Sequence, residues 1–497
     1  MKSWLLLLSL FAVVHSYPRS IPLGIFLNEK ECVHESPGKN LELVVKFIRQ
    51  RRNNSTAPFR FNENGTGVDR CLQGEHRFPK DAWGILRHVC NKLKDGFFMM
   101  IANGGDGRRT AYSSLAETMQ VPFINLNWSP ELLNLVDRKR FEISIRPPTS
   151  ELIADWILLR RWQNITYVYD DQSGLMNLEE VYDHLGEKTQ SSSSKFKVNA
   201  ELIQLPADPQ LFGEFLEKFH RDRFNDTSRE MFRIVLDISS SYRQEQLLNS
   251  LRRSELTFPR RFHYLIASYD FTKRQIEEFN DVYVNITGFQ LINDKNPYVW
   301  SFIKRYEAFL RKEMRMSEKE LDSSLYIEQA LMHDALAVAL RVLERTLKQD
   351  EQLFGEALQK ANLVFNHDDR GIYCFPDEDV KYKMKDSKRQ FKPFEFGAAI
   401  AQKLKKVSLD SARTLTGAIE FDRKRGIRKN FEVVVFDLTY SPDSAYSNTN
   451  RLLWRQGVGF NGSETLLSRH KKPPQPTRQK PLVVTTVEVT WQFVFLQ

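Results

Sequence analysis

Residues 97–126 read FFMMIANGGDGRRTAYSSLAETMQVPFINL, and this stretch decides the fold class. Two short apolar runs, 97–101 and 121–126, flank a glycine-rich turn and the amphipathic segment 110–119. Short apolar runs predict buried strands, and apolar residues at a period near 3.6 predict a helix. A helical crossover of this length is too long for a hairpin, so the pattern predicts parallel strands covered by helices.

The same alternation continues on both sides of this unit. Further helices are predicted at residues 41–51, 81–94, 151–162, 175–185, 209–219, 244–252, 299–311 and 324–347, and further strands at 21–27, 167–169, 200–205, 232–238, 262–266 and 284–291. Two packed α/β lobes accommodate this number of strands better than one very wide sheet. Near the end, 415–421 and 431–438 predict a closing hairpin.

The first sixteen residues predict the compartment. Lys2 precedes an apolar run at 4–14, and Val14-His15-Ser16 offers small residues at the two positions that signal peptidase reads. A run of about eleven residues is too short to span a bilayer, which needs roughly twenty. We therefore expect cleavage before Tyr17 and entry into the secretory pathway, with an extracellular destination.

Cysteine and asparagine usage agrees with this expectation. The four cysteines are an even number in an oxidising compartment, and they favour two disulfides over a metal site. Sequons occur along the whole length, as on an extracellular surface. The glycosylation sites that we expect are Asn54, Asn64, Asn164, Asn225, Asn285 and Asn461.

Several function classes are disfavoured. The net charge of +9 comes from scattered basic groups, and behind a signal peptide it does not indicate nucleic acid. The positive net charge is compatible with a weak attraction to acidic extracellular partners. The patterns GxSxG, HExxH and GxxxxGK[ST] are absent, so the sequence predicts neither an enzyme nor a bound metal or cofactor. His333-Asp334 is interpreted as part of a packed or half-exposed helix face.

Four segments carry a family resemblance: VNITGF at 284–289, LTGAIEFD at 415–422, and the runs at 162–170 and 330–337. Together they resemble the amino-terminal domain of the non-NMDA (AMPA and kainate) ionotropic glutamate receptors. The resemblance covers about residues 20–465.

The resemblance implies an α/β fold of the periplasmic-binding-protein type I class. Such a clamshell has two lobes, each a doubly wound, mainly parallel sheet, linked by three crossings that we place near residues 141–148, 282–289 and 415–421. The implied division is a signal peptide at 1–16, a first lobe at 17–145 and 289–390, a second lobe at 146–288 and 391–445, a linker at 446–480, and the truncated start of an agonist-binding core at 481–497.

The resemblance also implies a disulfide. Cys90 matches the family's cysteine on the second helix, and Cys374 matches its partner in a distant loop. Cys32 and Cys71 then remain to pair with each other, which the resemblance does not establish.

Amino-acid-binding relatives of this fold hold a ligand carboxylate at the turn that follows an early strand. The corresponding residues here are Gly104, Gly105, Asp106, Arg108 and Arg109. Helix N-termini favour anions, but Asp106 would repel a carboxylate at that place. We therefore expect the turn to be structural and the isolated domain not to bind glutamate, with a ligand held by Arg108 or Arg109 as the alternative.

The implied function is that of a receptor-derived module. It would mediate assembly into homo- or heteromeric dimers and tetramers with other glutamate receptor subunits and contact synaptic extracellular proteins, with membrane attachment only through a full-length receptor. Neither the agonist core nor the channel is expected in these residues. The runner-up is a secreted periplasmic-binding-protein-like binder of a small ligand. An extracellular domain of a guanylate cyclase or a class C G-protein-coupled receptor is a third interpretation.

Overall fold

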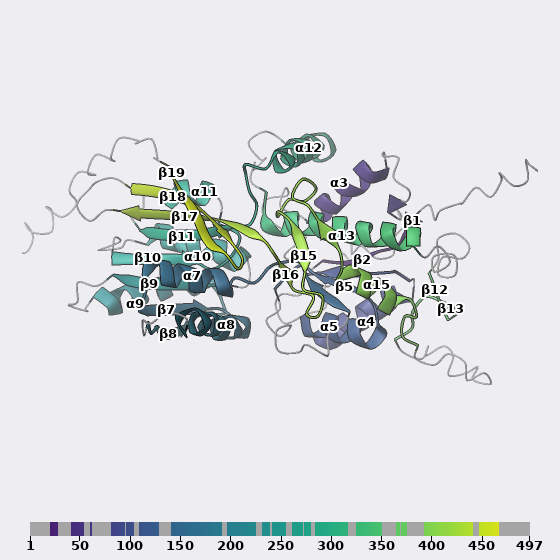
Figure 1. The fold of residues 1–497 in the computed structure, drawn as a ribbon, viewed down its shortest axis with the longest axis horizontal. Helices are drawn as coiled ribbons and strands as arrows, with labels where there is room; N and C mark the ends of the chain where they lie inside the picture. Colours follow the sequence, from purple (N-terminus) through teal and green to yellow (C-terminus); the bar gives the residue numbers. More distant parts are fainter. Residues whose placement is uncertain are drawn as a thin grey trace, which may run out of the picture.

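The structure is a computed structural model. It describes residues 20–27, 41–53, 60–61, 81–94, 96–103, 109–128, 141–190, 196–224, 231–238, 241–254, 261–271, 273–279, 284–316, 325–349, 364–367, 369–374, 392–440 and 447–466. Figure 1 shows two lobes side by side along the longest axis, each built around its own sheet. The expected signal peptide, Cys32, Cys71 and the tail at 481–497 lie outside the described residues.

The first lobe is built on a small parallel sheet. Its strands, in spatial order, are β2 (Gly24–Phe26), β4 (Met100–Ala102), β5 (Phe123–Asn125) and β6 (Glu142–Ser144). Every residue of these four strands is buried, because helices cover both faces of the sheet. Two short pairs lie apart from it: β1 (Ser20–Ile21) with β3 (Arg60–Phe61), and β12 (Phe365–Asn366) with β13 (Asp369–Arg370).

The helices of the first lobe come from distant parts of the chain. They are α3 (Leu41–Asn53), α4 (Ala82–Leu93), α5 (Arg109–Met119), α12 (Pro297–Met314), α13 (Ile327–Gln349) and α15 (Gly397–Leu404). The long α13 packs against both α3 and α15. Local signals set the helix starts: Asp81 accepts a hydrogen bond from the Gly84 amide at 2.7 Å, and Asn296 caps α12 ahead of Pro297.

The second lobe contains a larger, mixed sheet of eight strands. In spatial order they are β19 (Gly459–Leu466), β18 (Ser447–Arg455), β17 (Glu432–Tyr440), β11 (Asn285–Gln290), β10 (Phe262–Ile266), β9 (Phe232–Asp237), β7 (Asn164–Tyr169) and β8 (Asn199–Gln204). The five strands from β11 to β8 are parallel. The other three continue the sheet in antiparallel fashion.

Helices flank this sheet on both sides. They are α7 (Ser150–Arg160), α8 (Gln172–Gln190), α9 (Phe212–Phe224), α10 (Ser241–Arg253) and α11 (Lys273–Phe279), and a short 3-10 turn, η3 (Pro209–Leu211), precedes α9. Successive strand residues point to opposite faces, so Ile234 and Val235 of β9 belong to two different apolar clusters. Each face therefore has its own core, and the predicted doubly wound, two-lobed fold is confirmed.

Three predictions about the last part of the chain are wrong. The expected linker at 446–480 contains β18 and β19, and Trp454 in β18 is fully buried. The segment from 397 to 429, expected in the second lobe, lies with the first, because α15 packs against α13. The expected hairpin is also absent: 419–421 forms β15, which pairs with neighbours other than β17.

A small sheet marks the place where the chain passes between the lobes. Its strands are β14 (Ser408–Leu409), β15 (Ile419–Phe421) and β16 (Arg428–Lys429). An isolated parallel bridge joins Ser144 at the end of β6 to Ile427 just before β16. The chain leaves the first lobe after β6, returns after β11, and leaves it again after β16, so the first and third crossings are adjacent.

Candidate functional site

The predicted ligand turn can be placed only in part. Gly104, Gly105, Asp106 and Arg108 lie outside the described residues, and Arg109 is the first residue of α5. The described residues on either side are the end of β4 at Ala102 and the start of α5 at Arg109, at the carboxyl edge of the first-lobe sheet, which is the edge where open α/β sheets bind ligands. No contact of these side chains is described, so the structural interpretation of this turn stays a prediction.

A cluster of polar side chains joins the two lobes. It consists of Arg146 after β6, Ser241 at the start of α10, Asp270 after β10 and Glu328 in the first turn of α13, and we call it the interlobe cluster. The guanidinium of Arg146 lies 3.4 Å from Glu328 and 3.8 Å from Asp270. The Ser241 hydroxyl donates to Asp270 at 2.9 Å and also to Glu328. Since Glu328 belongs to the first lobe and Ser241 and Asp270 to the second, these contacts hold the lobes together.

The interlobe cluster contains two carboxyl groups, of Asp270 and Glu328, but one cation, Arg146. Burial and the neighbouring Glu328 carboxylate raise the pKa of Asp270 to about 7, against the opposing effects of Arg146 and Ser241. Among the described residues, Oδ1 of Asp270 and Nε of Arg146 are buried without a hydrogen-bond partner. Buried polar atoms are normally satisfied, so this cluster has unused capacity for a proton, a water molecule or a ligand.

A second network, which we call the hinge network, lies where the crossings meet. Asp334 of α13 accepts hydrogen bonds from the amides of Leu415 and Thr416 at 2.8 and 2.9 Å, and from the Thr416 hydroxyl at 2.6 Å. Arg428 of β16 donates to the Thr416 hydroxyl at 2.8 Å and to the carbonyl of Ile145 at 3.3 Å. Asp334, Thr416 and Arg428 are 0% exposed. The first and third crossings are thus joined through one buried arginine.

Burial has a clear effect on Arg428. It lowers the pKa of the guanidinium to about 10, and the nearby Asp334 carboxylate acts in the opposite direction. Arg428 also donates to the carbonyls of Thr416 and Ala418 at 2.6 and 2.9 Å, which helps to offset its removal from water. Of the two alternatives for His333-Asp334, a packed or a half-exposed helix face, the structure has the packed one, because His333 is 7% exposed and Asp334 is fully buried.

A third polar group lies at the carboxyl ends of β7 and β9. The Tyr167 hydroxyl donates to Asp237 at 2.6 Å, and the Asn177 amide donates to the same oxygen at 2.9 Å. Burial raises the pKa of Asp237 to about 7 and also raises the pKa of Tyr167. The Asn177 amide, in α8, also donates to the hydroxyl of Thr149, which precedes α7. This group therefore ties α8 and the start of α7 to the sheet of the second lobe.

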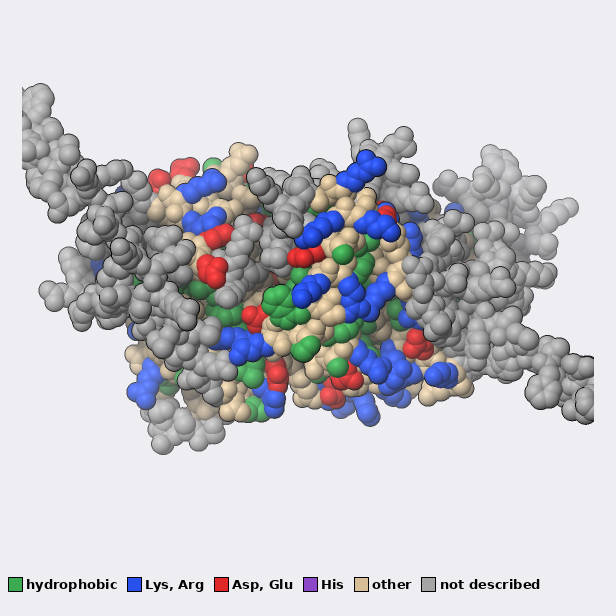
Figure 2. All heavy atoms as spheres, turned by 90° about the horizontal axis from the view of Figure 1, so that it is seen from above, with side chains coloured by type: hydrophobic (Ala, Val, Ile, Leu, Met, Phe, Trp, Pro, Cys, Tyr) green, Lys and Arg blue, Asp and Glu red, His purple; other side chains and the backbone are tan. Residues whose placement is uncertain are grey.

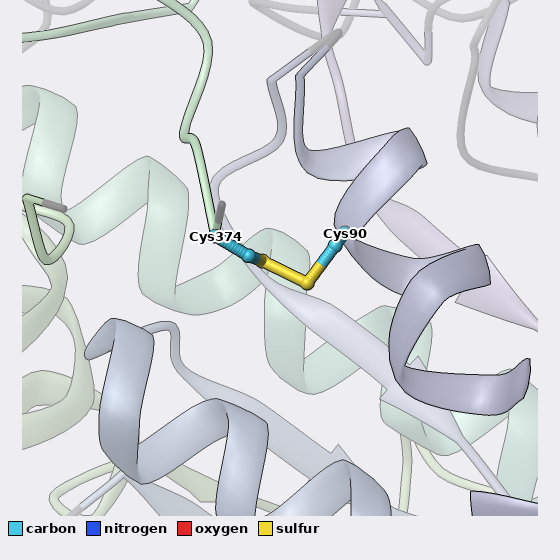
Figure 3. The surroundings of a disulfide bond; sticks show 2 residues. All are labelled: Cys90 and Cys374. Atoms are coloured by element: carbon cyan, nitrogen blue, oxygen red, sulfur yellow. A yellow bond between two sulfur atoms is a disulfide. The ribbon is translucent and has the colours of Figure 1, made fainter. Parts of the chain in front are cut away.

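Figure 3 shows the disulfide between Cys90 and Cys374, the pair that the resemblance implies. Cys90 lies in α4 and Cys374 in the segment that follows β13, 284 positions later in the sequence. The amide of Ile372 donates to the carbonyl of Leu93 at 2.8 Å, so hydrogen bonding supports the same contact. The bond ties an early helix of the first lobe to a late loop.

The predicted glycosylation sites differ in their surroundings. Asn164 and Asn461 are exposed, which suits a glycan. Asn285 is 2% exposed; its amide donates to the Phe262 carbonyl, and its oxygen accepts from the Tyr440 amide at 2.8 Å. A glycan on that amide nitrogen does not fit inside the sheet, so the prediction for Asn285 is wrong. Asn54, Asn64 and Asn225 lie outside the described residues.

Other site types were sought in the described part of the chain. There, three or more His, Cys, Asp or Glu side chains do not gather in a way that could hold a metal ion. No described helix is both long and apolar enough to cross a membrane. The sequence analysis missed the interlobe cluster because its members come from four separate elements. The local signals were single polar residues next to element ends: Asp270 after β10, Ser241 at the start of α10 and Glu328 in the first turn of α13.

Comparison with known proteins identifies the family. Residues 80–441 match the model of the receptor family ligand binding region. Glutamate receptor 2 of Caenorhabditis elegans is 28% identical over 416 residues, which are 80% of this chain and 41% of that protein. The kainate 1 ionotropic glutamate receptors of Mus musculus and Homo sapiens are 24% and 23% identical over 98% of this chain, and over 50% and 48% of their own length.

The chain thus spans about half the length of the curated relatives that it matches. The matched family region covers well over half of the chain and includes the interlobe cluster and the hinge network. The chain therefore belongs to the receptor family ligand binding region, and its similarity to glutamate receptors is consistent with the amino-terminal domain of an ionotropic glutamate receptor.

Proposed function

We propose that this chain is the extracellular amino-terminal domain of an ionotropic glutamate receptor subunit, acting in subunit assembly and partner recognition rather than in catalysis. The observation that carries the proposal is the two-lobed fold with paired crossings, combined with similarity to glutamate receptors over most of the chain. Its partners would be other glutamate receptor subunits, and synaptic extracellular proteins would be further ones. The signal-peptide pattern at 1–16 supports an extracellular location.

The helix α4 is the proposed contact between subunits. The resemblance implies that the early helices of the first lobe, α3 and α4, form the contact. The apolar side of α3 is already used inside the lobe, because Phe47 packs against three aromatic rings of α12. In α4, Trp83 is 56% exposed, and the Arg87 guanidinium lies 5.7 Å from the centre of its ring. An exposed tryptophan beside an arginine is typical of the centre of a protein interface.

Sedimentation of the secreted chain tests this proposal. We expect a concentration-dependent dimer, which Trp83→Ala weakens about tenfold or more, as hot-spot truncations do. Trp300→Ala is the matched control, because Trp300 is also 56% exposed but lies on α12. A chain that stays monomeric at high concentration contradicts the assembly function, and equal losses in the two variants contradict the choice of α4.

A second candidate function is small-ligand binding between the lobes. It is favoured by the interlobe cluster, where Nε of Arg146 and Oδ1 of Asp270 are buried and have no hydrogen-bond partner among the residues that the structure describes. A bound ligand at about one hundred times its Kd would raise the free energy of unfolding by about 2.7 kcal/mol. Thermal unfolding across a metabolite panel measures this. A stabilising ligand whose effect is lost in Asp270→Asn supports the binder, and an unchanged melting temperature with every compound counts against it.

A further inference from the structure

The outer face of α12 is basic. Its inner side is fixed by Phe302, Tyr306 and Phe309, whose rings lie 5.5, 5.4 and 5.3 Å from that of Phe47 in α3. Positions on the opposite side of the helix are therefore turned to solvent. The exposed basic residues there are Lys304, Arg305, Arg311, Lys312 and the C-cap residue Arg315.

The acidic residues of α12 offset only part of this charge. The helix contains four basic residues and two acidic ones, Glu307 and Glu313. Glu313 lies 3.4 Å from Lys46 of α3, so its charge is directed toward the neighbouring helix. Helix α3 itself contains four basic residues and one acidic residue. Figure 2 shows Lys and Arg side chains gathered on this face of the first lobe.

An exposed aromatic side chain lies at the start of the same face. Trp300 is 56% exposed, and it stands one turn before Lys304. A large exposed aromatic ring is more often part of a binding surface than of a solvated helix. The apolar face of a sugar ring stacks on such a side chain, while the neighbouring cations suit sulfate groups. We name this set of residues, Trp300 with the five exposed basic residues of α12, the α12 face.

We propose that the α12 face binds a sulfated glycosaminoglycan. This inference rests on the proposed extracellular location, where such chains are available. A linear polyanion matches a stripe of cations along one helix, because each cation pairs with a sulfate and releases a counterion from it. The single exposed ring fits stacking on one sugar, whereas a membrane surface would need a continuous apolar stripe.

Binding of the full chain to immobilised heparin tests the proposal. The test variant carries Lys304→Ala, Arg305→Ala, Arg311→Ala and Lys312→Ala, all at exposed positions. The control variant carries Lys197→Ala, Lys218→Ala, Arg221→Ala and Arg253→Ala, which are exposed in the second lobe and remove the same formal charge. We expect about a tenfold or greater loss of affinity and a flatter salt dependence in the test variant, but only a small loss in the control.

A second pair of variants isolates the aromatic contribution. Trp300→Ala keeps every charge, so we expect a several-fold weaker affinity for heparin with an unchanged salt dependence. Trp83→Ala, at an equally exposed tryptophan on α4, should leave heparin binding unaltered. Desulfated heparin should not bind. Because dimerisation is expected to respond to Trp83 and heparin binding to Trp300, failure of one proposal is distinguishable from failure of the other.

Three results would overturn the inference. The first is absence of heparin binding at physiological salt. The second is an equal loss in the two quadruple variants, which would mean that the net charge of the whole protein drives the attraction. The third is binding of anionic vesicles or an acidic peptide that depends on the α12 face while heparin binding does not.

Discussion

The interlobe cluster joins the two lobes, whereas the hinge network joins two of the crossings between them, and the two sites differ in how completely they are buried. In the hinge network, Asp334, Thr416 and Arg428 are 0% exposed and make several hydrogen bonds each. In the interlobe cluster, the side chain of Glu328 is 21% exposed. Within the described part of the chain, each site has at least one buried atom without a hydrogen-bond partner, Nε of Arg428 in the hinge network and Nε of Arg146 in the interlobe cluster.

This difference indicates a division of roles. A buried network with many hydrogen bonds is costly to break, because each lost partner leaves a polar group without water. A partly exposed ion pair contributes little, since water and salt compete with it. We infer that the hinge network fixes where the chain crosses, whereas the interlobe cluster sets how readily the lobes separate. The predictions below test that division.

The largest effect is expected from Arg428→Met. The substitution leaves the carbonyls of Thr416, Ala418 and Ile145 without their donor and removes the cation near the buried Asp334 carboxylate. We therefore expect a loss of about 3–5 kcal/mol in the free energy of unfolding. Urea denaturation measures this loss. Arg423→Met, at an exposed position in the turn before β16, is the control and should change stability by about 0.5 kcal/mol or less. Similar losses in both variants would mean that the buried hydrogen bonds of Arg428 contribute no more to stability than an exposed arginine does.

A smaller effect is expected from Thr416→Val. Valine keeps the volume but removes the hydroxyl that donates to Asp334 and accepts from Arg428, which should cost about 1–3 kcal/mol. Thr346→Val is a matched control, because Thr346 is equally buried and donates only to the Val342 carbonyl within α13. If the control loses as much stability as the test variant, the hydrogen bonds of Thr416 to the charged Asp334 and Arg428 contribute no more to stability than a bond to a neutral carbonyl.

The interlobe cluster should show itself in the pH dependence of stability. The folded pKa of Asp270, about 7, is above its usual value of 3.8. The folded protein therefore binds the extra proton between these values, and the contribution of Asp270 is complete below about pH 4 and is lost as the pH rises to about 7. Burial also raises the pKa of Asp237 and Glu180 to about 7, so the informative quantity is a difference between proteins.

Asp270→Asn supplies that difference. Asparagine cannot ionise, so stability should fall less steeply between pH 4 and pH 7 in the variant than in the wild type. Urea denaturation at several pH values measures the two slopes. Parallel slopes in the two proteins would show that Asp270 does not titrate with a raised pKa.

The smallest effect is expected from Glu328→Gln. The pair with Arg146 is partly exposed, so the free energy of unfolding should change by about 1 kcal/mol or less. The lobes should nevertheless separate more often, which small-angle scattering would detect as a larger radius of gyration. Glu307→Gln on α12 serves as the control. A large loss of stability with an unchanged radius would reverse the roles assigned to the two sites.

Much of this fold could be predicted from the sequence, because local periodicity reflects which face of a segment is buried. The predicted helix at 41–51 corresponds to α3, and the strand at 284–291 contains β11. The linker prediction failed because residues 447–466 are largely polar and the strands they form lie at a sheet edge. There only particular residues, such as Trp454, are buried; its indole donates to Asp155 of α7 at 2.8 Å.

Asn285 shows the same limit at a single residue. Its sequon is a local pattern, but whether the side chain is exposed depends on β10 and β17, which flank it in the sheet and lie elsewhere in the chain. The disulfide between Cys90 and Cys374 could be expected only through resemblance, since nothing local relates two residues 284 positions apart.

The sequence by itself determined the α/β class, the alternation of helices and strands, and the family segments, because each of these depends on residues close together in the chain. The tertiary structure decided which residues meet between the lobes. Arg146, Ser241, Asp270 and Glu328 come from four elements, and their pKa values and hydrogen bonds depend on burial that arises only when the lobes pack together.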